Sequence, residues 1–356
     1  MKELERYLSD LEERIDPQEE EHLLQQWKAF CNGRLGGKLF SPARGRKFPS
    51  RVKWPEIGIN ESLKDMHKMA LHQFARCSRI LEEGSGELLC VRANYGTGIL
   101  PSLFGAELFL MEDRLNTLPS ARPLAEGTAA VKRCIDRGVP NLNSALGARV
   151  FEMAGFFLEI RKTYPKIGRL VAIYHPDLQG PMDVCELLWG SGLFLDVLDQ
   201  PGLVKEFLTL ITDSYIAFMD RWNTLISPEN NYAVHWSMLH RGRVMLREDS
   251  AVNFSPEMFR EFIEPYARRV FQRLGGGAVH FCGKGDHFID ILSEMEGLYA
   301  VHMSQPHLND MEKIFVNTID KNIKLIGLNR TAAMNALKAG RNLRGQVHCW
   351  DRQSLN

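Results

Sequence analysis

The strongest constraint on the fold of this 356-residue chain is an alternation of short apolar runs with amphipathic stretches after Gly84. Apolar runs of this length are typical of buried strands, and the stretches between them have helical spacing. Such alternation predicts a parallel sheet with right-handed crossovers. The eight runs are Leu88–Ala93, Leu170–Tyr174, Tyr232–Trp236, Val244–Arg247, Ala278–Cys282, Tyr299–Met303, Ile323–Leu328 and Gln346–Trp350. Eight repeats favour an α/β fold closed into a (β/α)8 TIM-type barrel, and a doubly wound open sheet is the alternative.

The first 85 residues have a different pattern, which predicts a helical extension. Helical spacing covers residues 2–14, and Asp16-Pro17 starts a second helix that runs to about Cys31. A further helix is expected over residues 61–82. Between them, residues 34–53 carry seven basic residues and no acid, as either a solvated connector or a loop that binds anions or a protein. We therefore expect an extension with a basic connector over residues 1–85 and the barrel over residues 86–356.

Charge and cysteine content limit the possible partners and compartment. The 44 basic residues balance the 44 acidic ones, so net charge gives no reason to expect a nucleic acid or a membrane as partner. The seven cysteines include no Cys-x-x-Cys pair, the N-terminus does not resemble a signal peptide, and no apolar run reaches the ~18 residues of a membrane span. We expect a soluble cytoplasmic protein with free thiols.

The run that ends in His280-Phe281-Cys282-Gly283 places two metal-ligating side chains on one face of a strand. Side chains alternate between faces, so His280 and Cys282 point the same way. One imidazole and one thiol are two ligands of a possible zinc site. Strand ends converge in a closed barrel, which makes Cys349 the expected third ligand, with His302 or His348 as alternatives.

Other polar residues also follow the predicted strands, where a barrel places its chemistry. Each has a structural alternative, because a strand-end histidine is often only hydrogen-bonded and an acidic residue often caps the next helix. The expected catalytic or substrate-contacting residues are Glu248, Asp249 and His302. The residues expected to line the pocket and bind a cofactor are Tyr95, Asp177, His235 and Trp236.

Two stretches carry a resemblance to a known family. The segment from Glu248 to Tyr266, followed by His280-Phe281-Cys282-Gly283, resembles the uroporphyrinogen decarboxylase superfamily, and so does the segment from Asp177 to Asp183. The resemblance runs from about Asn94 to Cys349 and implies a TIM-type barrel. This chain lacks the arginine-rich motif of the true decarboxylases and has Asn94-Tyr95 where their first strand ends in aspartate.

The other branch of the superfamily is the methylcobamide:thiol methyltransferases, which bind zinc through His-x-Cys and a later cysteine. His280, Cys282 and Cys349 match that pattern in order and position. The resemblance implies a zinc-dependent methyltransferase that acts between a corrinoid (cobalamin), held by a small partner protein, and a small-molecule thiol acceptor or O-methyl donor. The alternatives are a lyase of the uroporphyrinogen decarboxylase type and a non-catalytic binding protein.

Overall fold

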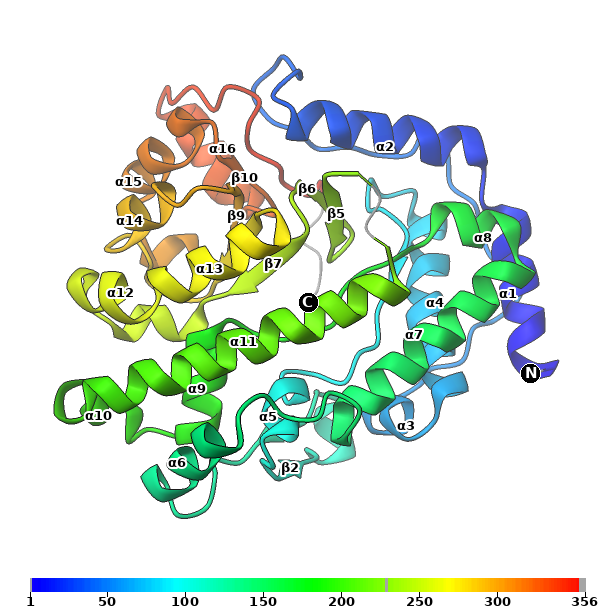
Figure 1. Cartoon of the computed structure of the whole chain (residues 1–356). Helices are drawn as coiled ribbons and strands as arrows, with labels where there is room; N and C mark the ends of the chain where they lie inside the picture. The colour runs from blue at the N-terminus through cyan, green and yellow to red at the C-terminus, as the bar shows by residue number, and fades with distance from the viewer. Residues whose placement is uncertain (1, 228–229, 352–356) are drawn as a thin grey trace.

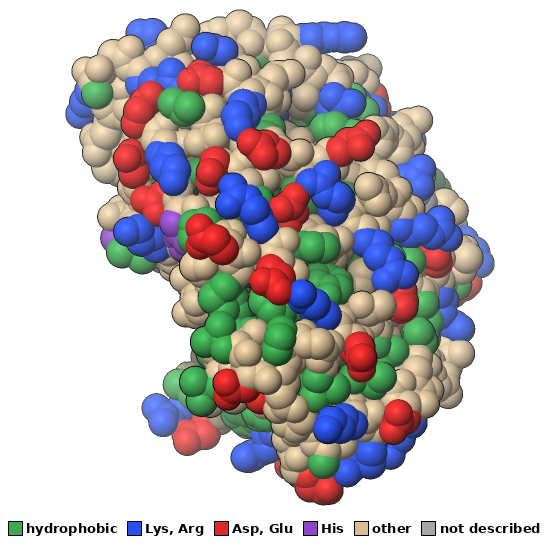
Figure 2. All heavy atoms as spheres, turned by 60° about the vertical axis from the view of Figure 1, so that its left-hand side comes forward, with side chains coloured by type: hydrophobic (Ala, Val, Ile, Leu, Met, Phe, Trp, Pro, Cys, Tyr) green, Lys and Arg blue, Asp and Glu red, His purple; other side chains and the backbone are tan. Residues whose placement is uncertain are grey.

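Strands and helices alternate along most of the chain, and the fold is α/β as the sequence predicts. The computed structural model describes residues 2–227 and 230–351. Figure 1 shows the helices arranged around a central group of strands. Within the described residues, no helix combines the length and the apolar character needed to cross a bilayer. Figure 2 shows basic and acidic side chains interspersed over one face of the molecule, in keeping with their equal numbers.

Two parallel ladders form the centre of the fold. β1 (Cys90–Val91) pairs with β4 (Ala172–Ile173). The larger sheet has the order β10-β9-β8-β7 and consists of β7 (Val244–Arg247), β8 (Gly277–Phe281), β9 (Leu298–Met303) and β10 (Lys324–Leu325). Single parallel bridges extend it, from Leu325 to Val347 and from His348 to Phe40. Since the described ladders remain two separate sheets, a closed eight-stranded barrel stays a prediction.

The run Tyr232–Trp236 is not a parallel strand, and this part of the sequence prediction is wrong. β5 (Tyr232–His235) instead forms an antiparallel hairpin with β6 (Met238–Arg241). Trp236 and Ser237 both have positive φ, as the two central residues of a type I′ hairpin turn do, and they lack the Asn-Gly signal that usually predicts such a turn. β6 packs against β8, β9 and the N-terminal helix α2 (Pro17–Cys31), so β6 lies inside the molecule, while most of β5 is half-buried (Figure 1).

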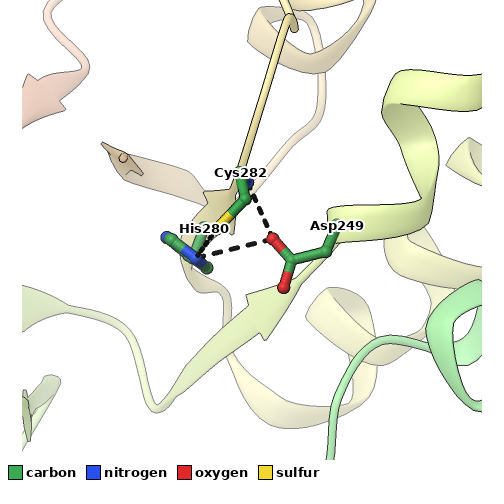
Figure 3. A group of neighbouring side chains, drawn as sticks. All are labelled: Asp249, His280 and Cys282. Carbon is green, nitrogen blue, oxygen red and sulfur yellow. Dashed lines mark hydrogen bonds and ion pairs between the residues drawn. The ribbon is translucent and has the colours of Figure 1, made fainter. Parts of the chain in front are cut away.

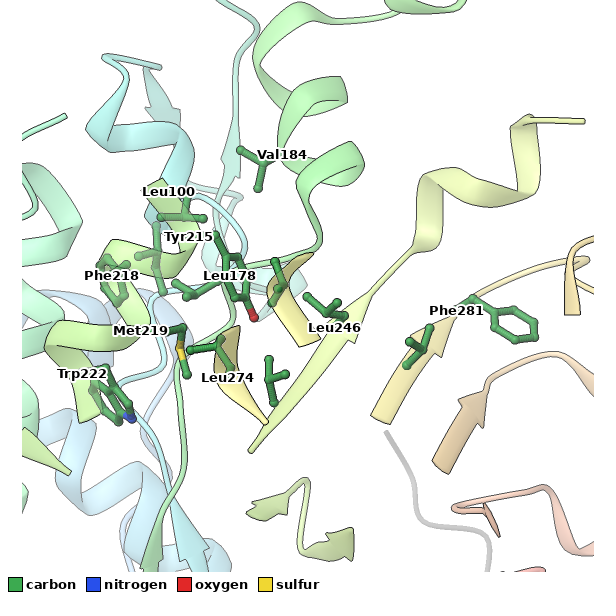
Figure 4. Packing of buried hydrophobic residues seen from close by; sticks show 14 of the residues in the cluster. Leu100, Leu178, Val184, Tyr215, Phe218, Met219, Trp222, Leu246, Leu274 and Phe281 are labelled. Atoms are coloured by element: carbon green, nitrogen blue, oxygen red, sulfur yellow. The ribbon is translucent and has the colours of Figure 1, made fainter. Parts of the chain in front are cut away.

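Side chains of the central strands alternate between two hydrophobic clusters, as the period of a strand requires. Leu246 faces outward into the larger cluster, where Tyr215 and Phe218 of the long helix α11 (Pro201–Leu225) also lie (Figure 4), and Val279 belongs to the same cluster. Met245 and Ala278 face inward, into a smaller cluster with the hairpin.

The helices that follow β1 are α5 (Ile99–Leu103), α6 (Thr128–Arg137), α7 (Ala145–Thr163), α8 (Pro165–Leu170), α9 (Pro181–Trp189), α10 (Leu193–Asp199), α11 (Pro201–Leu225), α12 (Pro256–Phe262), α13 (Glu264–Leu274), α14 (Ile289–Ser293), α15 (Met311–Asn317) and α16 (Arg330–Lys338). The short antiparallel pair is β2 (Leu108–Phe109) and β3 (Ser120–Ala121).

The first two N-terminal helices begin and end close to the predicted positions, whereas the single helix expected over residues 61–82 is divided in two at Asp65, whose backbone is extended and whose side chain caps the second part. The helices are α1 (Lys2–Arg14), α2, α3 (Ile59–Lys64) and α4 (Met66–Glu83), and the Asp16 side chain caps α2 by accepting from the backbone N–H of Gln18 and Glu19. α1 and α4 contribute to the larger cluster and α2 to the smaller one, so these helices share the core of the main body.

The basic segment lies against these helices and forms ion pairs with them. Arg44 makes a buried two-pronged pair with Glu20 of α2, with N–O distances of 2.7 and 2.6 Å. Arg46 pairs with Asp16, and Arg51 pairs with Glu13 of α1. These intramolecular pairs explain part of the charge in residues 34–53 without an external partner.

Candidate metal centre

Three potential metal ligands meet at the carboxyl ends of β7 and β8. Asp249 begins the short turn that follows β7, His280 lies on β8 and Cys282 follows it (Figure 3). One ligand atom from each residue lies within 4.8 Å of the other two. The parallel register brings them together, since Arg247 stands opposite His280 in the ladder and Asp249 comes two residues later.

The two distances from His280 Nε2 to the other ligand atoms fit a zinc ion. Cys282 Sγ is 3.3 Å from His280 Nε2, and that nitrogen is 3.5 Å from Asp249 Oδ1. With bonds of about 2.0–2.3 Å, a tetrahedral zinc ion separates its ligand atoms by about 3.3–3.8 Å. Sulfur, imidazole nitrogen and carboxylate oxygen are all donors that zinc accepts. Three protein ligands would leave the fourth position open to a substrate.

His302 orients the imidazole of His280. It stands opposite His280 in the β8–β9 ladder, and the two Nδ1 atoms are 2.7 Å apart. If Nε2 of His280 faces the ligand cluster, Nδ1 of His280 carries the proton. This Nδ1–H then donates a hydrogen bond to Nδ1 of His302. Such a hydrogen bond fixes the tautomer and the ring of a metal-binding histidine. His302 therefore acts behind the cluster in this arrangement.

Burial holds these side chains in neutral forms. Desolvation lowers the pKa of His302 to about 4, and it lowers the pKa of His280 well below its usual value, with a smaller contribution from the neighbouring His302. Desolvation also raises the pKa of the Cys282 thiol to about 11. A neutral imidazole is ready to bind a metal, whereas the thiol needs a cation beside it to lose its proton.

Cys349, expected as the third ligand, lies elsewhere. The group of three described above contains Asp249 and does not contain Cys349. Cys349 is fully buried in the larger, outward-facing cluster with Leu325 and Val347, and its Sγ is 3.4 Å from Ser41 Oγ. Its neighbour His348 points the other way, toward the rings of Trp27 and Trp350. Strand alternation explains why only one of these two adjacent residues can face inward, and that residue is His348.

Two further acidic side chains, Asp183 and the predicted Glu248, lie next to Asp249 of the ligand cluster. Asp183 of α9 accepts hydrogen bonds from the backbone N–H of Asp249 and Ser250 at 3.1 and 2.8 Å, which fixes the turn that carries Asp249. Burial raises the pKa of Asp183 to about 7, and the nearby Asp249 adds to the effect. Glu248 is 1% exposed, and in the described structure neither of its carboxylate oxygens has a hydrogen-bond partner. Burial, followed by the charges of Asp183 and Asp249, raises its pKa well above the usual value.

A second buried polar group surrounds Arg247. Its guanidinium pairs with Asp177 at 2.6 Å and contacts His235 Nε2 at 3.1 Å. Asp177 also lies 3.5 Å from Arg92. These contacts bring two of the predicted pocket residues, Asp177 and His235, into one network.

Trp236 lies between this network and the ligand cluster. Its ring centroid is 4.6 Å from the Arg247 guanidinium and 5.1 Å from the ring of His280. Tyr95 instead packs in the larger hydrophobic cluster, with the Arg149 guanidinium 5.0 Å from its ring. Sequence reasoning did not single out Arg92 or Asp183 as site residues. Arg92 precedes the expected strand end, while Asp183 follows Gly180-Pro181 and could be read as a helix-start acid.

The fold and the ligand cluster together define an α/β protein with a candidate metal centre at the carboxyl ends of parallel strands. No family profile and no characterised protein sequence matches this chain. Among solved structures, it is similar to a methyltransferase from Methanosarcina mazei, with a TM-score of 0.63 and 16% sequence identity. The similarity covers 92% of this chain and 91% of that one. At this identity, the likeness shows a shared fold.

Proposed function

We propose that this protein is a zinc-dependent methyltransferase, which moves a methyl group between a corrinoid on a small partner protein and a thiol or O-methyl substrate. The observation that carries the proposal is the cluster of Asp249, His280 and Cys282, whose spacing suits zinc with one position left open. The fold shared with the Methanosarcina mazei methyltransferase supports the reaction class.

The residues of the cluster have distinct tasks in this proposal. His280 contributes Nε2, Cys282 its sulfur and Asp249 one carboxylate oxygen, while His302 holds the imidazole in place from behind. Bound zinc supplies Lewis acidity, which lowers the pKa of a thiol and polarises an ether oxygen. The backbone N–H of Cys282 donates to Asp249 Oδ1 at 2.7 Å and keeps that oxygen beside the other two ligand atoms.

Asp249 takes the place that the sequence resemblance assigns to Cys349. A carboxylate is a weaker electron donor than a thiolate, so a site with one sulfur leaves the ion a stronger Lewis acid than a site with two. This donor set favours substrates that need polarisation, such as an O-methyl ether, as well as thiols.

Glu248 is the candidate proton donor for the O-methyl direction. An alkoxide or phenoxide that loses its methyl group needs a proton, and a carboxyl kept neutral by burial can supply one. Beside it, Arg247, Asp177 and His235 form a buried polar wall that can hold the substrate near the cluster.

The test uses purified protein loaded with zinc, with free cobalamin in place of the corrinoid protein. Methylcobalamin and a panel of thiols test one direction, and cob(I)alamin with methoxylated aromatic compounds tests the other. We expect methyl transfer in at least one direction, lost after zinc removal, restored by zinc and absent in Cys282→Ala. The matched control is Cys185→Ala, which removes a thiol buried in α9.

Three results would count against the proposal. They are no transfer in either direction, transfer that persists without zinc, and release of carbon dioxide from uroporphyrinogen by the metal-free protein. The last result would establish the lyase alternative.

A further inference from the structure

The hairpin β5–β6 reaches the candidate metal centre with a strained turn. Its two central residues, Trp236 and Ser237, have φ values of 48° and 62°, in the left-handed region that favours glycine. Ser237 connects the turn to β1 and to the residues just before it, because its carbonyl accepts from the Leu88 N–H at 2.9 Å and its hydroxyl lies 3.4 Å from Cys90 Sγ. Bulky side chains rarely occupy such turns, so a tryptophan held there suggests a role for its ring.

The Trp236 ring contacts both histidines of the hydrogen-bonded pair. Its centroid is 5.1 Å from the ring of His280, in an edge-to-face arrangement at 89°, and 5.2 Å from the ring of His302. Its ring also contacts the His235 ring at 4.8 Å and the Arg247 guanidinium at 4.6 Å, which is itself held by Asp177. The indole is therefore fixed by a cation on one side and packs against the two imidazoles of the pair on another.

The central strands offer little packing of their own beneath these histidines. The inward-facing residue two positions before His280 is Ala278, and the one before His302 is Ala300. At Gly327, an added Cβ would lie 2.6 Å from the His302 ring. Met238 and Leu239 of the hairpin share a hydrophobic cluster with both alanines and fill the space that larger side chains would occupy in a barrel of this type.

We infer that the hairpin positions the metal centre, with Trp236 as the positioning residue that holds the His280–His302 pair in its metal-binding orientation. The inference deepens the proposed function and rests on the same ligand cluster. A mobile imidazole loses conformational entropy when the ion binds, and this loss weakens binding. A ring that is already packed against an indole loses less. Trp236 thus raises metal affinity without contacting the ion.

The first experiment compares zinc affinity, measured by competition with a chromophoric chelator well below the unfolding temperature. We expect Trp236→Ala to weaken binding by about tenfold to hundredfold, the range typical of residues that orient a ligand. Trp236→Phe should restore affinity to within about threefold, because a smaller aromatic ring still packs against both imidazoles. The matched control is Trp54→Phe, since Trp54 packs on Tyr7 of α1. Cobalt substitution adds a spectroscopic readout, in which the thiolate-to-cobalt band should shift in Trp236→Ala alone.

The second experiment needs no metal and separates this inference from the proposed function. Diethyl pyrocarbonate labelling of the metal-free protein, followed by mass spectrometry, reports how accessible each histidine is. Labelling of His280 and His302 should rise several-fold in Trp236→Ala and stay near the parent value in Trp236→Phe and Trp54→Phe. Trp236→Leu, which retains apolar volume without a ring, replaces the alanine variant if the latter does not fold.

The outcomes are distinct. A parent protein that binds no zinc would overturn the proposed function, while raised labelling in the variant would still support positioning by Trp236. A folded Trp236→Ala or Trp236→Leu protein with parental labelling of both histidines would overturn the inference, whatever the zinc measurement shows.

Discussion

Acid should destabilise this protein through histidines that are buried in their neutral form, and His240 of the hairpin offers the cleanest test. It is 1% exposed, its Nδ1 lies 2.8 Å from the Arg241 carbonyl oxygen, and its Nε2 has no hydrogen-bond partner in the described structure. Desolvation lowers its pKa to about 4. His175 and His348 are buried as well, and desolvation lowers the pKa of each to about 3.

The magnitude follows from proton linkage. An unfolded histidine titrates near pH 6.5, so below that pH the unfolded chain binds a proton that folded His240 does not. The stabilising contribution of neutral His240 is complete above pH 6.5 and is lost progressively as the pH falls toward 4. Between pH 7 and pH 5 the loss is about 2 kcal/mol for this one residue, at about 1.4 kcal/mol per pH unit.

The assay is urea denaturation of zinc-free protein at pH 7 and pH 5, for the parent and for His240→Phe. Phenylalanine retains the ring volume and cannot be protonated, so the variant should lose about 2 kcal/mol less than the parent between the two pH values. The control is Leu239→Ala in the same strand, which should lower the unfolding free energy by about 2–5 kcal/mol equally at both. Equal pH dependence in the parent and His240→Phe would refute the reasoning.

Three further changes test other parts of the account. His302→Phe should weaken zinc binding by about tenfold to hundredfold in a chelator competition, because the hydrogen bond that orients His280 is lost. Glu20→Gln should lower the unfolding free energy, measured by urea denaturation, by about 3–5 kcal/mol, since it leaves Arg44 buried without its counter-charge. The control is Glu13→Gln at the exposed pair with Arg51, which should change the unfolding free energy by less than about 1 kcal/mol. Glu248→Gln should leave stability at pH 7 within about 1 kcal/mol of the parent, because burial already keeps the carboxyl neutral and no partner is lost. The same variant should slow demethylation of an O-methyl substrate, measured as methylcobalamin formed.

Local patterns were enough to place most of the parallel strands and the first helices. The Asp16-Pro17 signal located the start of α2, and the four-residue run Val244–Arg247 corresponds to β7. His280 and Cys282 were paired by strand alternation alone, and the structure brings them together. These features depend on residues close in sequence, for which side-chain period and capping are direct guides.

The parts that sequence missed depend on contacts between distant segments. Nothing local shows which of His348 and Cys349 faces inward, because a shift of one residue reverses the face. The position of Asp249 beside His280 and Cys282 follows from the register between β7 and β8, which no pattern within either strand contains. The hairpin was missed because Trp236 and Ser237 adopt a conformation that their side chains disfavour, and tertiary packing holds them there.

The zinc content of three purified proteins tests the central claim most directly. Elemental analysis of the parent, Cys282→Ala and Cys349→Ala should find about one zinc per chain in the parent and in Cys349→Ala, and almost none in Cys282→Ala, because the ligand cluster contains Cys282 and not Cys349. Loss of zinc from Cys349→Ala, or a parent protein without zinc after expression in zinc-supplemented medium, would contradict the account.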